Sequence, residues 1–475
     1  MRGWMLSRAS RRPRTGPVPE GPVEGAIYVS LTGSDSTGDG SVGNPYRTLH
    51  IPCDPTDARC AQPGDTIYIR GGVYDTIGTD VYYCWYGTSN IGYLGTRRRS
   101  TSADSIYWGG TEGNPITIKS YPGETAILDG KNHSHHPRSF EDGHDTNGPH
   151  MLTIFGHWLV IEDIHVRWGV GTGIGMAGDN NIVRNVRSYK NHSDGFFGDG
   201  SNNLWEYCVS HNNNQVATNG VGGDGWKRGT GYTYSQTFGT AAAGDVDAMT
   251  GNTWRYCVAY ENSDDGFDMG LSKNALVEYC VSLREGVGSS GMGVGYKMSL
   301  GSTANTNNVF RYCLSHGDRQ GFNSNTGLKT LVHNCTAIAA NNGFVLTRNN
   351  SPNSECDNAA HNNLSIDMTT IRIVGQTGCL GDIPTTHTHN AGSTSAWENG
   401  TYGSDNMQLS EAQLAMVSKN PTAAGFATLE SESLARNAGV VVNQASDTDL
   451  GAIPYGTAFA GGWDWQSEVY DPEAP

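Results

Sequence analysis

The sequence has few charged residues and little positive charge. Only 16% of its 475 residues are charged, and 31 Lys and Arg stand against 47 Asp and Glu, which gives a formal net charge of −16. Proteins that bind nucleic acids need positive charge to neutralise the phosphates. The charge balance therefore excludes a nucleic-acid-binding protein of the usual basic kind.

Long apolar runs are also absent. No segment approaches the roughly 18 consecutive apolar residues needed to cross a bilayer, so no contact with a membrane is expected. Residues 1–25 contain five arginines but no apolar segment typical of a signal peptide, and they are expected to form a disordered tail. The location of the protein has to be inferred from its function.

The ten cysteines lack the spacing of a zinc site. A Cys53–Cys60 disulfide and a Cys356–Cys379 disulfide are possible and would fit an oxidising compartment, whereas Cys84 is left without an assigned partner. The remaining five occur in similar strand-like segments and are expected to be buried thiols: Cys208, Cys257, Cys280, Cys313 and Cys335.

Glycine, by contrast, is abundant. The chain has 64 glycines, roughly twice the frequency of an average protein, and Asn, Ser and Thr crowd its middle. This composition indicates an all-β chain with many turns. A single solenoid can reach this length because each coil contacts only its neighbours.

A short strand-like segment recurs through the middle of the chain. Six copies alternate apolar and polar residues: IVRNVRSYKN, NLWEYCVSHN, TWRYCVAYEN, LVEYCVSLRE, VFRYCLSHGD and LVHNCTAIAA. Their aligned positions are Val186 followed by the five cysteines above, at separations of 22, 49, 23, 33 and 22 residues. A period near 22 with insertions predicts a parallel β-helix, in which the cysteines form one interior column.

A second repeat follows each of these segments. Glycine is followed by an aromatic residue at Gly195-Phe196, Gly225-Trp226, Gly266-Phe267, Gly295-Tyr296, Gly321-Phe322 and Gly343-Phe344. We expect the glycines to form bends and the aromatic rings to fill the core. If the pairs stack, two further columns form. One contains Asp194, Asp224, Asp265, Val294, Gln320 and Asn342, and the other contains Phe197, Lys227, Asp268, Lys297, Asn323 and Val345.

These columns bring acidic residues together. Asp224 and Asp265 are expected on neighbouring coils, with Asp264 adjacent and Asp268 at the next strand position of the same coil as Asp265. Clustered carboxylates raise one another's pKa or bind a cation, and an oxygen-rich site of this kind suits Ca²⁺. The alternative is that these residues only form Asx-turns, which is the role expected of Asp194.

Lys297 follows Asp268 in the second column. A nearby divalent cation and partial burial would lower the pKa of this lysine and let it act as a base. Alternatively, Lys297 only forms a salt bridge with Asp268. Lys227 is a rival base, although a substrate-binding or structural role is favoured for it.

Several motifs resemble the family 9 polysaccharide lyases, which are right-handed parallel β-helix pectate lyases. They are IYVSLTGSDSTGDGSVGNPYRTLH, PGDTIYIRGGVY, GDGW, NSDDGFDMG, GVGYKM and RQGFNSN, and the similarity runs from about Ile27 to Gly456. The resemblance implies an all-β solenoid of about ten coils. It also implies that Asp264, Asp265 and Asp268 hold a catalytic Ca²⁺ with an Asp of the preceding coil, best matched by Asp224, and that Lys297 is the base.

Two features depart from the family pattern. Residues 232–250 form an insertion that contains Asp245 and Asp247, and Asn323 stands where the family usually has an acidic residue. The substrate is therefore less well defined by the sequence than the mechanism.

The expected reaction is β-elimination in an acidic polysaccharide, most simply pectate or polygalacturonate. Ca²⁺ would bind the uronate carboxylate while Lys297 takes the C5 proton and the C4 oxygen departs. Because the chain is acidic overall, cationic side chains must line the groove. Candidates are Arg228, Lys273, Arg284, Arg311, Arg319, Lys329 and Arg348. Of all polar residues near these coils, we predict substrate contacts for Arg319, Lys227, Arg284 and Asn323.

Three other functions remain open. A β-helix glycoside hydrolase would use paired carboxylic acids without a metal. A carbohydrate-binding adhesin or tail-spike protein would bind glycans without cleaving them, and a lyase for another uronan would share the mechanism. The expected protein is a secreted monomer with a disordered tail (1–25), a β-helix domain (26–375) and a C-terminal region (376–475) that caps the helix. His387, His389 and Asn390 are expected in a solvent loop of that region.

Overall fold

The computed structural model describes most of the chain between residues 23 and 374. The described ranges are 23–54, 57–75, 94–95, 108–131, 151–169, 171–214, 223–228, 250–270, 272–287, 291–298, 307–324, 329–346, 358–368 and 371–374, with shorter pieces between 387 and 466. Positions outside these ranges include the tail 1–22, Cys84, Cys356, Cys379, Asp245, Asp247, Arg348, His389 and Asn390.

Within these ranges the strands form three long parallel sheets. The first sheet contains β1 (Ile27–Val29), β2 (Thr66–Ile69), β6 (Ile116–Ser120), β9 (Leu159–Glu162), β12 (Ile182–Arg184), β15 (Leu204–Glu206), β18 (Thr253–Arg255), β21 (Leu276–Glu278), β24 (Val309–Arg311), β27 (Leu331–His333), β30 (Ala359–His361) and β33 (His387–Thr388). The second sheet contains β3 (Gly72–Asp75), β7 (Ala126–Asp129), β10 (Ile164–Arg167), β13 (Arg187–Tyr189), β16 (Val209–His211), β19 (Val258–Tyr260), β22 (Val281–Leu283), β25 (Leu314–His316), β28 (Thr336–Ile338), β31 (Leu364–Ile366), β34 (Ala391–Ser393) and β35 (Met407–Leu409).

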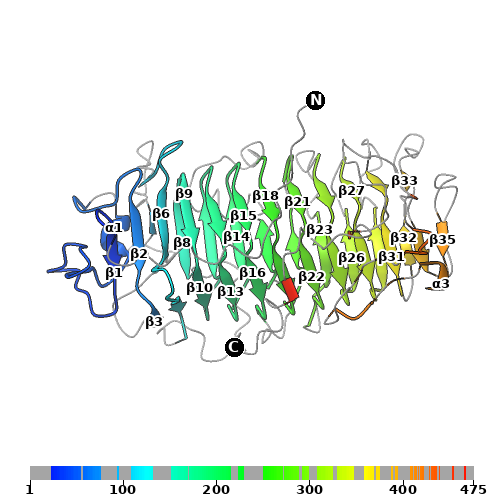
Figure 1. Ribbon diagram of the computed structural model, residues 1–475, viewed down its shortest axis with the longest axis horizontal. Helices are drawn as coiled ribbons and strands as arrows, with labels where there is room; N and C mark the ends of the chain where they lie inside the picture. The colour runs from blue at the N-terminus through cyan, green and yellow to red at the C-terminus, as the bar shows by residue number, and fades with distance from the viewer. Residues whose placement is uncertain are drawn as a thin grey trace.

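The third sheet contains β4 (Leu94–Gly95), β8 (Leu152–His157), β11 (Ile174–Ala177), β14 (Phe196–Asp199), β17 (Trp226–Arg228), β20 (Phe267–Asp268), β23 (Val294–Lys297), β26 (Gln320–Asn323), β29 (Asn342–Val345) and β32 (Ile371–Val374), and β5 (Trp108–Gly109) pairs with β8. Each strand pairs with the corresponding strand of the next coil, so the coils follow one another along the long axis of the molecule (Figure 1). The described strands number 12, 12 and 11 in the three sheets, somewhat more coils than expected. The predicted parallel β-helix is confirmed.

Helices are short by comparison. The structure describes α1 (His50–Cys53) near the first coil and α3 (Glu411–Leu414) near the last. Among the described residues, no helix has the length and apolar character needed to span a membrane.

Side chains of one kind stack from coil to coil in the interior. The five predicted cysteines are completely buried, and the aromatic rings from Phe196 through Trp226, Phe267, Tyr296 and Phe322 to Phe344 stack with centroids 4.6 to 5.0 Å apart. This spacing matches the distance between neighbouring strands. Both predicted core columns are therefore confirmed, and Trp226 and Tyr296 are core residues.

The outer face of the first sheet carries charges of alternating sign. Strand pairing aligns Lys119, Glu162, Arg184, Glu206, Arg255, Glu278 and Arg311, one from each of seven successive coils. Oppositely charged neighbours lie 2.6 to 3.9 Å apart. We call this row the charge ladder. It pairs each glutamate with cations from the coil before and the coil after.

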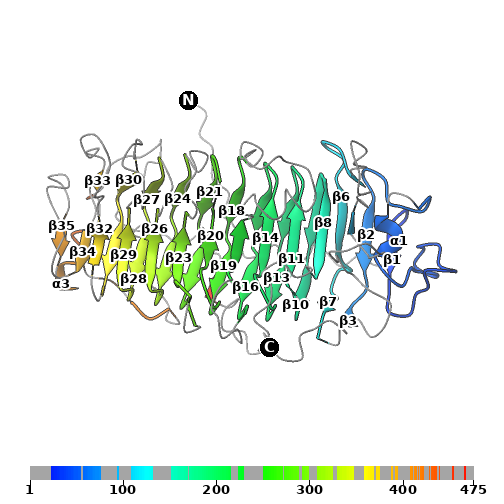
Figure 2. The same ribbon diagram turned by 180° about the vertical axis from the view of Figure 1, so that it is seen from behind.

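The C-terminal region does not simply cap the end of the helix. β33 and β34 continue the strand pairing beyond residue 375, and β35 and α3 lie at that end (Figures 1 and 2). Later pieces run back along the outer face of the second sheet, where Ile453 and Trp465 pack in one apolar cluster with Val281 and Leu314. These pieces cover apolar side chains on that outer face, while the proposed boundary of the C-terminal region at residue 376 stays a prediction.

The Cys53–Cys60 disulfide that the sequence left possible is not formed in this structure. Both thiols are free, with Cys53 completely buried and Cys60 partly exposed. Burial raises the pKa of the Cys53 thiol well above its usual range, which keeps it uncharged. The short spacing alone suggested a bridge that the local backbone does not make.

Candidate active site

The strand register of the third sheet places charged residues side by side. Lys227 pairs with Asp268 between β17 and β20, Asp268 pairs with Lys297 between β20 and β23, and Lys297 pairs with Asn323 on β26. The column predicted from the Gly-aromatic repeat is therefore present. It brings two lysines to either side of one aspartate.

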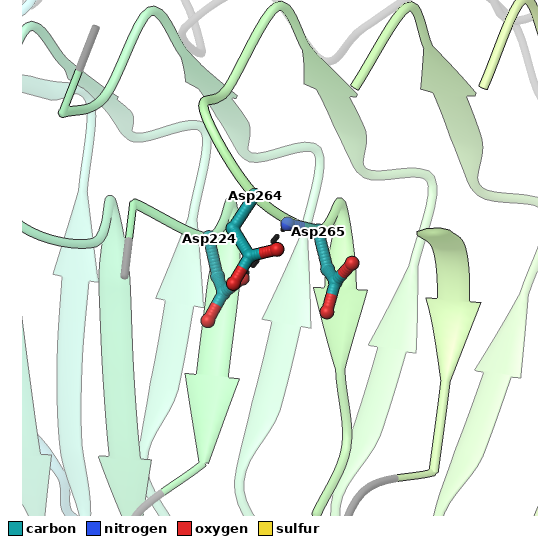
Figure 3. Close-up of side chains that lie close together, drawn as sticks. All are labelled: Asp224, Asp264 and Asp265. Carbon is teal, nitrogen blue, oxygen red and sulfur yellow. Dashed lines mark hydrogen bonds between the residues drawn. The ribbon is translucent and has the colours of Figure 1, made fainter. Parts of the chain in front are cut away.

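The other predicted column lies at the turn that enters these strands. The N–H of Gly195 donates to the backbone oxygen of Asp224, and the N–H of Gly225 donates to that of Asp265, so the two aspartates lie on neighbouring coils. Their carboxylates and that of Asp264 each offer an oxygen within 4.8 Å of the others. Figure 3 shows the three side chains converging from two successive turns.

Hydrogen bonds fix these aspartates through one carboxylate oxygen each. Asp224 Oδ1 accepts the N–H of Asp265 at 2.8 Å, and Asp265 Oδ1 accepts the N–H of Val294 at 2.8 Å. Asp194 Oδ1 accepts the N–H groups of Gly223 and Asp224 in the same manner. These bonds join neighbouring coils and are not the local Asx-turns expected from the sequence, and Oδ2 of Asp224 and of Asp265 takes no part in them.

Burial makes this arrangement electrostatically costly. Asp224 and Asp265 are both 0% exposed. Burial raises the pKa of Asp224 well above its usual range; Lys227 opposes the rise and Asp264 adds to it. Burial likewise raises the pKa of Asp265 to about 7 against the opposing charge of Lys297, and it raises the pKa of Asp264. Charged carboxylates are therefore disfavoured here unless more positive charge is supplied.

Lys297 lies directly against the cluster. Its Nζ donates to Asp265 Oδ2 at 2.5 Å and lies 3.4 Å from Asp268 Oδ2, and the residue is only 6% exposed. Burial disfavours the ammonium, but Asp268, Asp265 and Asp224 outweigh burial and raise the pKa of Lys297. This direction is opposite to the one expected from the sequence, which did not include the direct contact with Asp265.

Lys227 occupies a matching position one coil earlier. Its Nζ donates to Asp224 Oδ2 at 2.8 Å. Burial acts against the ammonium, yet Asp224, Asp194 and Asp268 raise the pKa of Lys227 well above its usual range. Each lysine thus neutralises the free oxygen of one buried aspartate.

Asp268 lies at the edge of the cluster. It is 6% exposed, and its Oδ1 accepts the N–H of Gly270 at 3.2 Å while its Oδ2 faces Lys297. It is not part of the group of three carboxylates that approach one another within 4.8 Å. The structure therefore brings together three of the four predicted metal ligands and holds the fourth beside Lys297.

The predicted substrate-binding residues lie at different distances from the cluster. Asn323 follows Lys297 in the column and donates to Gln320 Oε1 at 2.7 Å. Arg284 instead pairs with Glu261 at 2.6 Å at the end of the second sheet.

Arg319 and a short backbone segment complete the site. The Arg319 side chain is exposed and donates to the backbone oxygen of Gly291. In the same segment, the N–H of Met292 donates to Asp264 Oδ1 at 2.6 Å. Sequence reasoning did not identify this contact, although the glycine-rich GVGSSGMGVG sequence marks a segment whose backbone can approach closely.

The donor set suits calcium. Three carboxylates from two coils converge, burial raises the pKa of Asp224 and of Asp264, and oxygen ligands of this kind are preferred by hard divalent cations. Asp224, Asp264 and Asp265 would hold the ion, whereas Asp268 lies beside Lys297 and outside this group of three. No nitrogen or sulfur ligand lies in this group, which disfavours zinc.

Comparisons with known proteins agree with the fold and the expected resemblance. The family model described as "Pel9A-like, right handed beta helix region" matches residues 27–363. Pectate lyase PEL9 of Emericella nidulans is 26% identical over 348 residues, which is 68% of this chain and 72% of the relative.

Solved structures show the same architecture. The crystal structure of pectate lyase Pel9A superimposes with a TM-score of 0.61 at 19% identity, covering 90% of this chain and 96% of that one. A rhamnogalacturonan lyase gives a TM-score of 0.57 at 21% identity over 86% and 97% of the two chains. The chain therefore belongs to the Pel9A-like family of right-handed β-helix proteins.

Proposed function

We propose that this chain, which its family makes a polysaccharide lyase, is calcium-dependent and cleaves pectate or polygalacturonate by β-elimination with Lys297 as the base. The class of enzyme rests on the family and on relatives that are themselves pectate lyases. The single observation that supports the finer proposal is the position of Lys297, whose amine touches a buried cluster of carboxylates at 2.5 Å.

Calcium bound by Asp224, Asp264, Asp265 and Asp268 would supply a Lewis acid for the uronate carboxylate and stabilise the charge that develops at C5. The backbone hydrogen bonds occupy one oxygen each of Asp224 and Asp265, and the other oxygen of each accepts a lysine, Lys227 or Lys297, with which the ion would share it. The buried cluster would thereby gain the positive charge that it lacks.

Lys297 removes the C5 proton in this proposal. To do so it has to lose the proton that Asp265 and Asp268 now stabilise on it. Engagement of Asp265 as a metal ligand would weaken this stabilisation, so that Lys297 could release its proton to solvent and face the substrate as a neutral amine. The electron pair of the C5–H bond forms the C4–C5 double bond as the C4–O bond breaks, so the product carries an unsaturated non-reducing end.

Cations around the cluster bind the acidic substrate. Lys227 and Arg319 supply positive charge on either side of Lys297 along the helix axis, and Asn323 offers an amide one coil beyond the base. Arg284 contributes less, because it follows β22 of the second sheet, outside the column of Lys227 and Lys297, and pairs there with Glu261. A secreted monomer that meets its polymer outside the cell fits this proposal.

The test is to incubate the protein with polygalacturonate, with calcium or with a chelator, and to follow the ultraviolet absorbance of the unsaturated product. We expect a calcium-dependent rise that is lost in Lys297→Ala. If the protein binds the polymer but wild type gives no rise with polygalacturonate, alginate or rhamnogalacturonan, the catalytic proposal is wrong and a carbohydrate-binding protein remains.

A further inference from the structure

A cluster of positive charge lies on the same edge of the helix as the site, toward the N-terminus. Lys131, Trp168 and Lys190 lie just beyond strands β7, β10 and β13, which are neighbours in the second sheet. Lys131 Nζ lies 5.5 Å and Lys190 Nζ 5.7 Å from the centroid of the Trp168 ring. The two amines therefore approach one indole, from the coil before it and the coil after it.

No carboxylate of the described part of the chain neutralises these two lysines. Among the described residues, neither Lys131 nor Lys190 forms an ion pair with a carboxylate. The nearby Asp129 is taken by Arg167, whose Nε lies 2.7 Å from Asp129 Oδ2. Burial together with the charges of Arg167 and Lys131 lowers the pKa of Lys190, as expected where cations gather without acids. In a chain with a formal net charge of −16, such a cluster is unusual.

The position of the cluster relates it to the active site. Lys190 begins the turn that leads through Asp194 into β14, and β14 pairs with β17, the strand that follows Asp224. Lys190 thus lies one coil before the coil of Asp224, and Lys131 lies two coils earlier still. At about 4.8 Å per coil, the lysines are displaced from the carboxylates by roughly 5 to 15 Å along the helix axis.

We propose that Lys131, Trp168 and Lys190 form a binding subsite for carboxylates of a polyuronate chain that extends from the active site toward the N-terminus. The inference rests on the proposed function, because it assigns the subsite to the same polymer. Trp168 is a positioning residue in it: cation–π contact and packing of the aliphatic stems hold both amines at fixed positions.

The arrangement suits a polyanion better than a neutral sugar. The approach of an amine from either side limits access to the indole ring, so recognition relies on charge and hydrogen bonding by the ammonium groups. A polyuronate presents carboxylates at regular intervals, and two separated cations can each bind one of them. Partial burial of Lys190 lowers the local dielectric and strengthens the attraction.

The test compares Lys131→Gln/Lys190→Gln with wild type and with Lys119→Gln. Lys119 is a matched control because it also lies over an aromatic ring, with Nζ 5.8 Å from the centroid of Tyr68, but on the first sheet. Binding of long polygalacturonate and of neutral dextran is measured without turnover, in a Lys297→Ala background, and steady-state kinetics are measured with long polymer and with short oligogalacturonides.

We expect the double variant to bind long polygalacturonate about tenfold more weakly and to show a similar increase in KM, with kcat and the kinetics on the shortest cleaved oligomers unchanged. Lys119→Gln should match wild type, and no protein should bind dextran.

Equal affinity of the double variant and wild type for long polymer would overturn the subsite even if the enzyme is active. Weaker binding by the double variant with no turnover by wild type would retain the subsite and reject the proposed function. If the double variant does not fold, Lys131→Gln alone, at an exposed position, is measured in the same way.

Discussion

The charge ladder on the first sheet and the carboxylate cluster on the third sheet are built by the same operation, the stacking of one residue from each coil on the next. In the ladder the sign alternates, so that Glu206 lies between Arg184 and Arg255. In the cluster Asp224 and Asp265 stack with the same sign, and Asp264 adds a third carboxylate.

The difference teaches which charges serve the fold. The alternating charges lie at the surface, with the arginines about one third exposed, and they neutralise one another and favour the correct register between coils. A stack of buried carboxylates does the opposite, because it costs free energy that no other part of the fold requires. We attribute the stack of Asp224 and Asp265 to the proposed calcium ion, because buried carboxylates with perturbed pKa values are typical of functional sites.

The largest expected effect is on catalysis. Lys297→Ala removes the base that touches Asp265, and the kcat of the lyase reaction should fall by about 10³-fold. The measurement is the rate of formation of the unsaturated product at saturating calcium. Lys119→Ala, which removes a lysine from the charge ladder, should stay within about twofold of wild type. A Lys297→Ala variant that keeps a tenth or more of the wild-type rate would assign the base elsewhere.

The next effect separates the two stacks by their affinity for calcium. Asp265→Asn removes a charged oxygen from the cluster, and the calcium affinity measured by calorimetry should fall about 100-fold or more. Glu278→Gln removes the same charge from the ladder, where Arg311 lies 2.6 Å away, and should leave calcium affinity unchanged. Similar losses in both variants would show that the overall negative charge of the chain, and not the cluster, attracts the ion.

A third effect concerns a polar stack that supports the site without belonging to it. Asparagine side chains accept backbone N–H groups from coil to coil, as Asn213 does for Asn191 and Asn262 does for Asn213. The row continues with carboxylates as acceptors. The backbone N–H of Asn262 donates to Glu285 Oε2, and the backbone N–H of Glu285 donates to Asp318 Oδ1. Burial raises the pKa of Asp318 to about 6.

Asp318→Asn introduces the residue type that the earlier coils carry at this position, and its effect on stability should depend on pH. The folded state keeps a proton on Asp318 that the unfolded state loses, so wild type loses stability as pH rises from about 4 to about 6 and carries the full cost above that. We expect the variant to be more stable than wild type by about 1–3 kcal/mol at pH 8, with no gain near pH 4. Thermal unfolding of both proteins at the two pH values checks this, and an equal shift at both would contradict it.

The smallest effect is expected within the charge ladder. Glu206→Gln leaves Arg184 and Arg255 without the carboxylate between them, and should destabilise the protein by about 0.5–1 kcal/mol at low salt and less at high salt. Thermal unfolding at two salt concentrations measures the loss. A loss of stability that does not respond to salt would mean that packing of these side chains, and not their charge, stabilises the ladder.

The sequence predicted the repeating parts of the molecule well. Stacking makes position in the repeat equivalent to position in space, so the columns through Cys208 and through Lys227, Asp268 and Lys297 followed from alignment alone. The sequence did not predict the contacts that the repeat leaves undetermined. Hydrogen bonding of Lys297 to Asp265 depends on side-chain direction, and the Met292 contact with Asp264 depends on a segment outside the repeat.

The same distinction applies to the two ends of the chain. The path of the C-terminal pieces along the second sheet is set by long-range apolar packing of Ile453 and Trp465, which has no period in the sequence. The free thiols of Cys53 and Cys60 likewise depend on local backbone geometry, which the seven-residue spacing does not specify.

The central claim is that the same-sign stack binds calcium and that the bound form cleaves a uronan. The most direct test is polygalacturonate cleavage by wild type and Asp265→Asn, each titrated with calcium after chelation, with ultraviolet absorbance as the readout. The account predicts that wild type is inactive without calcium and regains full activity with it, and that Asp265→Asn needs far more calcium. The account would be contradicted if wild type were fully active after chelation and Asp265→Asn cleaved the polymer at the same rate.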